Sequence, residues 1–124
     1  MKRVMILARR DDWEMDYVEE ELTNMHLTIE TCHQSMDFLE KYTRSYAQLV
    51  ILDVDLLKES LSQLVRILRS LNSEVKLLLV LSPNQLKHCA EVISMGDVNY
   101  FIKPISIKNL VEMVQSFLKP KKEE

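Results

Sequence analysis

The sequence predicts an α/β fold in which five strands form one doubly wound parallel sheet, with helices covering both faces. Five short apolar runs alternate along the chain with segments of helical periodicity. Three runs are nearly continuous in Val, Ile and Leu, which is typical of strands buried on both faces of a parallel sheet. The segments between them are long enough for the crossovers that parallel pairing requires. The runs are VMILA (4–8), LTIETC (27–32), QLVIL (48–52), VKLLLVL (75–81) and NYFI (99–102).

Each segment that follows a run carries apolar residues three or four positions apart, which predicts a helix with one buried face. Ser35 and Ser106 stand where a side-chain oxygen can cap the second and the last helix. Ser82 and Pro83 place a cap before a proline at the first position of the fourth helix. The apolar stripes lie within residues 15–25, 38–42, 61–71, 86–93 and 107–118.

Length and composition indicate a single domain with its own core. The chain has 124 residues, of which 47% are hydrophobic and 28% are charged. This balance is typical of a globular protein rather than a disordered one. We therefore expect one domain over residues 1–118, followed by a polar C-terminal tail at 119–124 that is too polar to pack.

Charge and glycine content exclude several classes of function. Sixteen Lys and Arg against nineteen Asp and Glu give a net charge of -3, which argues against direct binding of nucleic acid. The single glycine, Gly96, excludes both a P-loop and a GxGxxG dinucleotide loop. The apolar run at 4–8 is too short for a signal peptide or a membrane span, and Cys32 and Cys89 do not make a disulfide framework. We expect a cytoplasmic protein that has reduced thiols and makes no membrane contact.

Charged and hydroxyl side chains follow four of the five predicted strands, at the point where each strand ends. The carboxyl ends of parallel strands meet at one edge of a sheet, so these side chains are expected to converge there. A carboxylate at this edge can act as a nucleophile toward a phosphoryl group, while a hydroxyl and an ammonium bind the phosphoryl oxygens. The residues are Arg9, Arg10, Asp11, Asp12, Asp53, Asp55, Ser82 and Lys103, and Pro104 follows the last of them.

Three of these strand ends, taken in order, identify a known family. LVILD (49–53), VLS (80–82) and GDVNYFIKP (96–104) resemble the phosphoacceptor strand, the switch strand and the GADDYLxKP segment of bacterial response regulator receiver domains. The resemblance covers residues 2 to about 118, and it implies a flavodoxin-like fold with strand order 2-1-3-4-5. It also implies a signalling function in a two-component phosphorelay rather than turnover of a substrate.

The resemblance assigns a role to individual residues. Asp53 looks like the aspartate that accepts a phosphoryl group from a histidine kinase or a phosphotransfer protein. Ser82 looks like the switch residue, and Lys103 looks like the phosphate-binding lysine. Tyr100 falls on the aromatic position that rotates inward on activation, and Pro104 falls where the family has a proline after a cis peptide bond.

The first strand end departs from the family. Receiver domains carry two adjacent acids there that bind Mg²⁺, and in ungapped register this chain has Arg9 and Arg10 at those positions. Asp11 and Asp12 reach the acid positions only if the first helix is two residues shorter, which spoils its apolar stripe. The ungapped register therefore predicts an altered acidic pocket.

The altered pocket disfavours a metal cofactor. Arg9, Arg10 and Lys103 then face Asp53, where the family has three carboxylates and one lysine. Guanidinium groups repel Mg²⁺ and supply no ligand for it, so any metal left is held weakly, by Asp53 and the Asp55 backbone. An arginine is expected within hydrogen-bonding distance of Asp53, or linked to it through one water, as a built-in cation. The plainer alternative is that both arginines point into solvent.

Two functions stay open at this stage. One is a phosphoacceptor with an altered Mg²⁺ site, and the other is a pseudo-receiver that binds proteins without being phosphorylated. A flavodoxin-like cofactor carrier is disfavoured, because the first loop lacks the small polar residues that hold a flavin phosphate.

The resemblance also implies an output surface, formed by the fourth helix, the fifth strand and the fifth helix. Asn99, Tyr100, Lys108 and Glu112 are the candidates on or near this surface. Its partner is an output protein that the sequence does not name, or a second copy of the chain.

Overall fold

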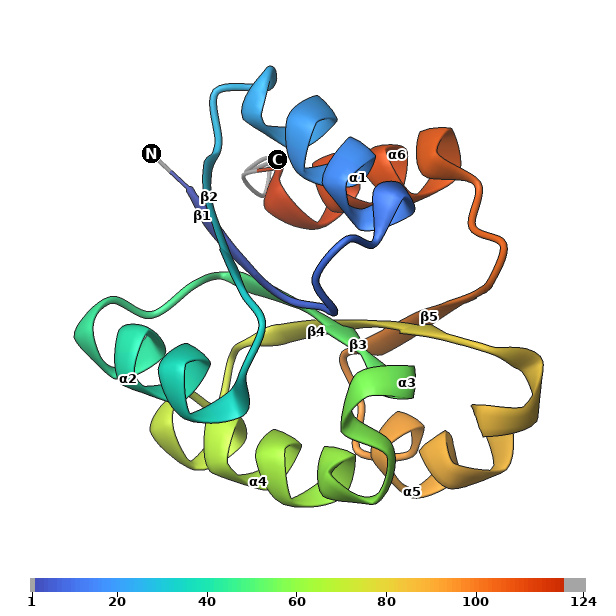
Figure 1. Ribbon diagram of the computed structural model, residues 1–124. Helices are drawn as coiled ribbons and strands as arrows, with labels where there is room; N and C mark the ends of the chain where they lie inside the picture. The colour runs from blue at the N-terminus through green and yellow to red at the C-terminus, as the bar shows by residue number, and fades with distance from the viewer. Residues whose placement is uncertain (1, 120–124) are drawn as a thin grey trace, which may run out of the picture.

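A computed structural model describes residues 2–119 and contains one five-stranded parallel sheet of order β2-β1-β3-β4-β5 (Figure 1). This is the fold and the strand order that the sequence predicts. Each strand falls within one residue of its apolar run. The strands are β1 (Arg3–Leu7), β2 (Thr28–Cys32), β3 (Leu49–Asp53), β4 (Lys76–Leu81) and β5 (Val98–Ile102). Of the tail predicted at 119–124, residues 120–124 lie outside the described residues.

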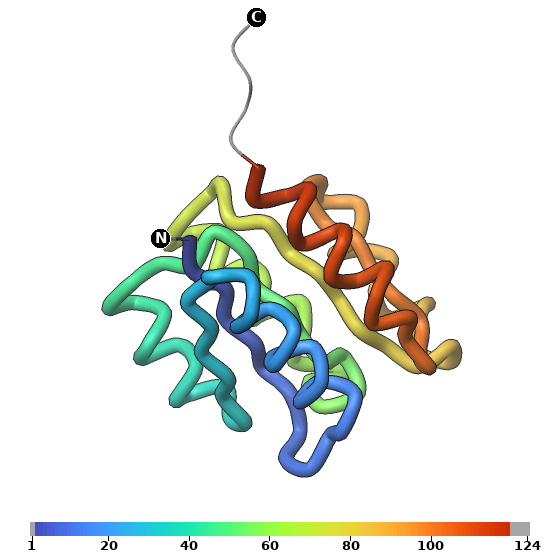
Figure 2. Tube along the Cα trace, turned by 90° about the horizontal axis from the view of Figure 1, so that it is seen from above, coloured from blue at the N-terminus to red at the C-terminus, as the bar shows by residue number. Residues whose placement is uncertain are grey.

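Helices cover both faces of the sheet. Helices α1 and α6 lie side by side on one face, and α2, α4 and α5 cover the other (Figures 1 and 2). Within residues 2–119, no helix combines the length and the apolar character needed to cross a bilayer. The helical elements are α1 (Trp13–Thr23), α2 (Ser35–Arg44), α3 (Val54–Leu57), η1 (Lys58–Ser60), α4 (Leu61–Leu71), η2 (Pro83–Cys89), α5 (Ala90–Ile93) and α6 (Ile107–Leu118).

The central strands β1, β3 and β4 are almost entirely apolar because each face of the sheet has its own core. Along β1, Val4 and Ile6 pack into the cluster beneath α1 and α6, while Met5 and Leu7 pack into the cluster beneath α2 and α4. All of these side chains are fully buried, and burial of one such side chain contributes about 1.5–3 kcal/mol. Burial on both faces removes the alternation of polar and apolar residues that a half-exposed strand would show.

The fourth helical segment differs from the regular α-helix that the sequence predicts. Residues 83–89 form the 3₁₀ helix η2, and only the short α5 follows. The inward positions are Leu86, Cys89 and Val92, each three residues after the last, which matches three residues per turn. Ala90, expected in the apolar stripe, is exposed.

The predicted caps have mixed outcomes. Ser106 caps α6, since its side chain accepts a hydrogen bond from the Asn109 backbone N–H. Ser35 is the first residue inside α2, and Gln34 occupies the cap position without a side-chain hydrogen bond. Ser82 stands at the cap position of η2, but its side chain does not cap that helix. The Ser82 hydroxyl instead donates a hydrogen bond to a side chain at the edge of the sheet.

The register of the strands brings the predicted strand ends together. Asp53 at the end of β3 pairs with Val80 of β4, two residues before Ser82. The Lys103 backbone N–H donates to the Leu81 carbonyl at 2.8 Å, which holds the end of β5 beside the end of β4. The peptide bond between Lys103 and Pro104 is cis.

Candidate functional site

Asp53 is the centre of the site and is fully buried. It is the last residue of β3 and also the N-cap of α3, because its Oδ1 accepts the Asp55 backbone N–H at 3.0 Å. A buried carboxylate is costly unless hydrogen bonds and opposite charges compensate it. The groups around Asp53 therefore decide what this site can do.

Lys103 supplies one of the opposite charges. Its Nζ lies 3.0 Å from Asp53 Oδ1 and 2.8 Å from Asp55 Oδ2, so a single ammonium joins both carboxylates. Burial by itself lowers the pKa of Lys103, but the hydrogen bonds and charges of Asp55 and Asp53 outweigh burial and raise that pKa above its ordinary value. Lys103 is therefore firmly cationic in this site.

Asp55 was expected at this edge of the sheet, but its pairing with Ser82 and Lys103 was not foreseen from the sequence. Its Oδ2 accepts the Ser82 hydroxyl at 2.5 Å, and its Oδ1 accepts the Ser82 backbone N–H at 3.2 Å. Burial raises the pKa of Asp55, but the hydrogen bonds from Lys103 and Ser82 outweigh this effect and leave the pKa below its ordinary value. One signal in the sequence was available: an N-cap at Asp53 puts Asp55 in the first turn of α3, close to the neighbouring strand end.

Acidification is expected to lower the free energy of unfolding through Asp55. Because its pKa is lowered in the folded protein, its ionised form contributes stability above the ordinary carboxyl pKa, and this is lost as the pH falls through the lowered pKa. Urea unfolding at a series of pH values from neutrality downward measures the effect. An Asp55→Asn variant should lose less stability over this interval than the unaltered protein, and parallel curves would contradict this role for Asp55.

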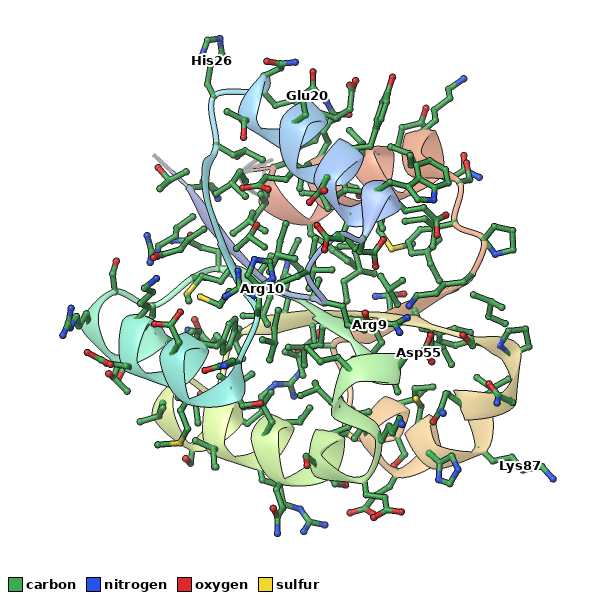
Figure 3. The ribbon with its side chains drawn as sticks, in the orientation of Figure 1. Arg9, Arg10, Glu20, His26, Asp55 and Lys87 are labelled. Carbon is green, nitrogen blue, oxygen red and sulfur yellow. The ribbon has the colours of Figure 1, made fainter. Side chains whose placement is uncertain are left out.

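Arg9 supplies the second opposite charge. Its Nε lies 3.7 Å from Asp53 Oδ2, while most of its side chain is exposed (Figure 3). This distance makes an ion pair but is too long for a hydrogen bond, and Asp53 Oδ2 is buried without a hydrogen-bond partner among residues 2–119. The expected built-in cation is thus present as a charge, while the expected direct hydrogen bond is absent. Arg10 is exposed and forms no ion pair within the described residues.

Asp11 and Asp12 do not reach the Asp53 carboxylate. Asp12 is the N-cap of α1, and its Oδ1 accepts the Met15 backbone N–H at 3.2 Å. Asp11 adopts a positive φ of 60° in the loop before it. These two residues line a hollow of about 350 Å³ together with Arg9, Arg10, Trp13, Glu14 and Lys103.

Glu14 is a residue that sequence reasoning missed. Its Oε2 accepts the Ile105 backbone N–H at 3.0 Å, which ties the first turn of α1 to the segment after Pro104. This contact links the loop that carries Arg9 to the loop that carries Lys103. The sequence does not reveal this contact, because the two partners are 91 positions apart in the chain.

The residues present do not fit a Mg²⁺ ion. Among residues 2–119, no three His, Cys, Asp or Glu side chains lie close enough together to hold a metal. Asp53 and Asp55 already pair with Lys103 and Arg9, so their two negative charges are balanced by two positive ones. Of the four carboxylate oxygens of Asp53 and Asp55, Asp53 Oδ2 accepts no hydrogen bond from residues 2–119, and it faces the Arg9 guanidinium group. Mg²⁺ would meet that positive charge instead of the oxygen ligands it prefers.

The other predicted site residues lie apart from the carboxylates. Tyr100 is on the edge strand β5 and is 40% exposed, as is Ile102 on the same strand. Lys108 and Glu112 of α6 line a hollow beside Tyr17 of α1.

Comparison with known proteins agrees with the fold. The family described as response regulator receiver domain matches residues 11–115. No match was found among the curated proteins. A two-component response regulator from Clostridium difficile is 16% identical with a TM-score of 0.78, and the likeness covers 95% of this chain and 96% of that one.

Two further solved structures share the fold. The chemotaxis response regulator CheY4 of Vibrio cholerae is 18% identical with a TM-score of 0.79, covering 95% of this chain and 99% of that one. The BeF₃-activated DrrB receiver domain is 22% identical with a TM-score of 0.81, covering 97% and 99%. The family match spans most of the chain, so the protein belongs to the response regulator receiver domain family, whose members signal rather than catalyse.

Proposed function

We propose that this receiver domain accepts a phosphoryl group on Asp53 from a histidine kinase or a phosphotransfer protein, with Arg9 and Lys103 in place of a metal. Receiver domains typically partner with histidine kinases. The observation that supports the proposal is the unequal state of the two Asp53 oxygens. Oδ1 is fixed by Lys103 and the Asp55 N–H, whereas Oδ2 accepts no hydrogen bond from the described residues and lies 3.7 Å from Arg9 Nε.

The transfer step follows from this asymmetry. Asp53 Oδ2 attacks the phosphorus of a phosphohistidine, and a P–O bond forms as the P–N bond breaks. The electron pair of the broken bond stays on the imidazole nitrogen, which takes up a proton. Arg9 and Lys103 then flank the new acyl phosphate and offset the charge that moves onto Asp53.

The test is phosphorylation by a small-molecule donor without metal. Phosphoramidate is expected to add one phosphoryl group in the presence of EDTA, seen as a gain in intact mass, and Asp53→Asn should abolish it. Arg9→Ala is expected to slow the reaction, while Arg10→Ala, which removes a neighbouring charge that pairs with nothing at the site, leaves it nearly unchanged. Labelling that needs Mg²⁺ contradicts the replacement of the metal, and no labelling under either condition contradicts the phosphoacceptor role.

A second function is favoured by a different observation. Ser82 and Lys103, the groups expected to bind the phosphoryl oxygens, already bind the Asp55 carboxylate. A site that is filled and charge-balanced in this way suits a pseudo-receiver that presents one fixed surface to a protein partner. Absence of labelling in the phosphoramidate experiment, together with intact partner binding, is the result that favours it.

We propose that the output surface centres on β5. This strand is the edge of the sheet, and it exposes two large side chains, Tyr100 and Ile102, that an output protein or a second copy of the chain can cover. Lys108 and Glu112 belong to the neighbouring surface between α1 and α6.

A further inference from the structure

We infer that the Asp55 carboxylate is an internal ligand of the anion-binding subsite formed by Ser82 and Lys103, and that any external oxyanion must displace it to bind there. The inference rests on the proposed function only where the displacing anion is a phosphoryl group on Asp53. Occupation of the subsite by Asp55 is a property of the unmodified chain.

The first argument is that the donors of the subsite converge on one carboxylate. The Ser82 hydroxyl and the Lys103 ammonium both donate to Asp55 Oδ2, at 2.5 and 2.8 Å, and the Ser82 backbone N–H donates to Oδ1 at 3.2 Å. A tetrahedral oxyanion requires the same kinds of donor around its oxygens: a hydroxyl, a backbone N–H and an ammonium. The carboxylate thus takes the place of two of the three terminal oxygens of a phosphoryl group.

The second argument is that the local backbone places the Asp55 carboxylate beside Ser82 and Lys103. Asp53 caps α3 and turns the backbone, so the residue two positions later lies against the end of β4. The Asp55 side chain is 13% exposed and the Lys103 side chain is 15% exposed, so their pairing is largely shielded from water. A desolvated, charge-assisted contact of this kind is stronger than an exposed ion pair.

The third argument concerns charge. Phosphorylation of Asp53 replaces its single negative charge with about two, in a site that already holds the Asp55 carboxylate. Lys103 and Arg9 together carry two positive charges, so they cannot fully neutralise the acyl phosphate and Asp55 at once. Asp55 must therefore leave the subsite when the anion enters. The helix that carries it has four residues, so its departure disrupts only one turn of backbone.

The experiment measures inorganic phosphate binding by following the Ser82 amide resonance in ¹H–¹⁵N spectra. The Asp55→Ala variant is expected to bind phosphate about tenfold more tightly than the unaltered protein, since it frees the donors of the subsite and removes one like charge. Asp11→Asn is the matched control. It removes one negative charge from the adjoining hollow, where Asp11 makes no hydrogen bond or ion pair with Ser82 or Lys103, and it keeps a residue type that tolerates the positive φ at this position.

The outcomes separate the explanations. Equal phosphate affinity in the unaltered protein and Asp55→Ala overturns the inference, and so does an equal gain in Asp11→Asn, because the effect would then be general charge repulsion. If Asp55→Ala does not fold, Asp55→Asn keeps the shape of the side chain, and the ¹³C shift of the Asp55 carboxyl during phosphate titration of the unaltered protein reports displacement directly. An unmoved carboxyl signal at phosphate saturation overturns the inference.

The same proteins test the proposed function separately. If Asp55→Ala gains phosphate affinity while phosphoramidate labels Asp53 in neither protein, the phosphoacceptor role fails and the internal ligand stands. If Asp53 is labelled at the same rate in both proteins and phosphate affinity is unchanged, the internal ligand fails and the phosphoacceptor role stands.

Discussion

Replacing Lys103 with methionine is expected to lower the free energy of unfolding by about 3 kcal/mol. This value is near the lower end of the losses seen when one partner of a buried ion pair is removed. The ammonium pairs with both Asp53 and Asp55, so its loss leaves two carboxylates with only Arg9 nearby. Methionine keeps much of the apolar stem, so the loss reports on charge rather than on packing. Urea unfolding at neutral pH measures it.

The control for this variant is Lys108→Met, which removes a lysine from the exposed surface of α6. It should change the free energy of unfolding by less than about 0.5 kcal/mol. Adding Asp55→Asn to Lys103→Met should restore part of the lost stability, because one unpaired carboxylate is removed. If the double variant loses more free energy of unfolding than the two single variants lose together, the loss in Lys103→Met does not come from unpaired carboxylates.

Asp53→Ala is expected to lower the free energy of unfolding by about 1–3 kcal/mol. Asp53 is fully buried, and the change removes the carboxylate that pairs with Lys103 and Arg9, as well as the acceptor for the Asp55 backbone N–H. In a site crowded with acids, removal of one carboxylate relieves repulsion and tends to stabilise the fold. The sign of the change therefore distinguishes a balanced site from an acidic one.

The Asp53→Asn variant separates the two contributions of Asp53 to stability, its negative charge and its cap of α3. Asparagine keeps an oxygen that can accept the Asp55 N–H but carries no charge. A smaller loss in Asp53→Asn than in Asp53→Ala assigns the difference to the cap of α3, and the remaining loss to charge. Thermal or urea denaturation gives both values, and an Asp53→Ala variant more stable than the unaltered protein would refute the built-in cation.

The fold and the convergence of Asp53, Ser82 and Lys103 are predictable from the sequence because they depend on short-range patterns. Each strand lies on a short run rich in apolar residues, and parallel pairing then brings the residues after β3, β4 and β5 to the same edge. The position of Arg9 is predictable for the same reason, since it follows β1 in this register.

The remaining contacts depend on side-chain directions that periodicity does not determine. Asp55 reaches Ser82 only because Asp53 caps α3, and Glu14 reaches Ile105 across two separate loops. Lys108, a candidate on or near the output surface, lines a hollow beside Tyr17 of α1. Its place on α6 follows from how the apolar side of the helix packs, which fixes the polar positions only indirectly.

The balance of charge at the end of the sheet couples positions that are far apart in the chain. Arg9 faces Asp53 Oδ2, and Lys103 joins Asp53 to Asp55, so a change of sign at any one of these positions leaves an opposite charge without its partner. A descendant that regained an acid at position 9 would place three carboxylates around one ammonium, and it would be viable only after position 55 had become neutral or a cation had been recruited. We therefore expect positions 9 and 55 to covary among the near relatives of this chain, so that the order in which the two substitutions occur is itself constrained.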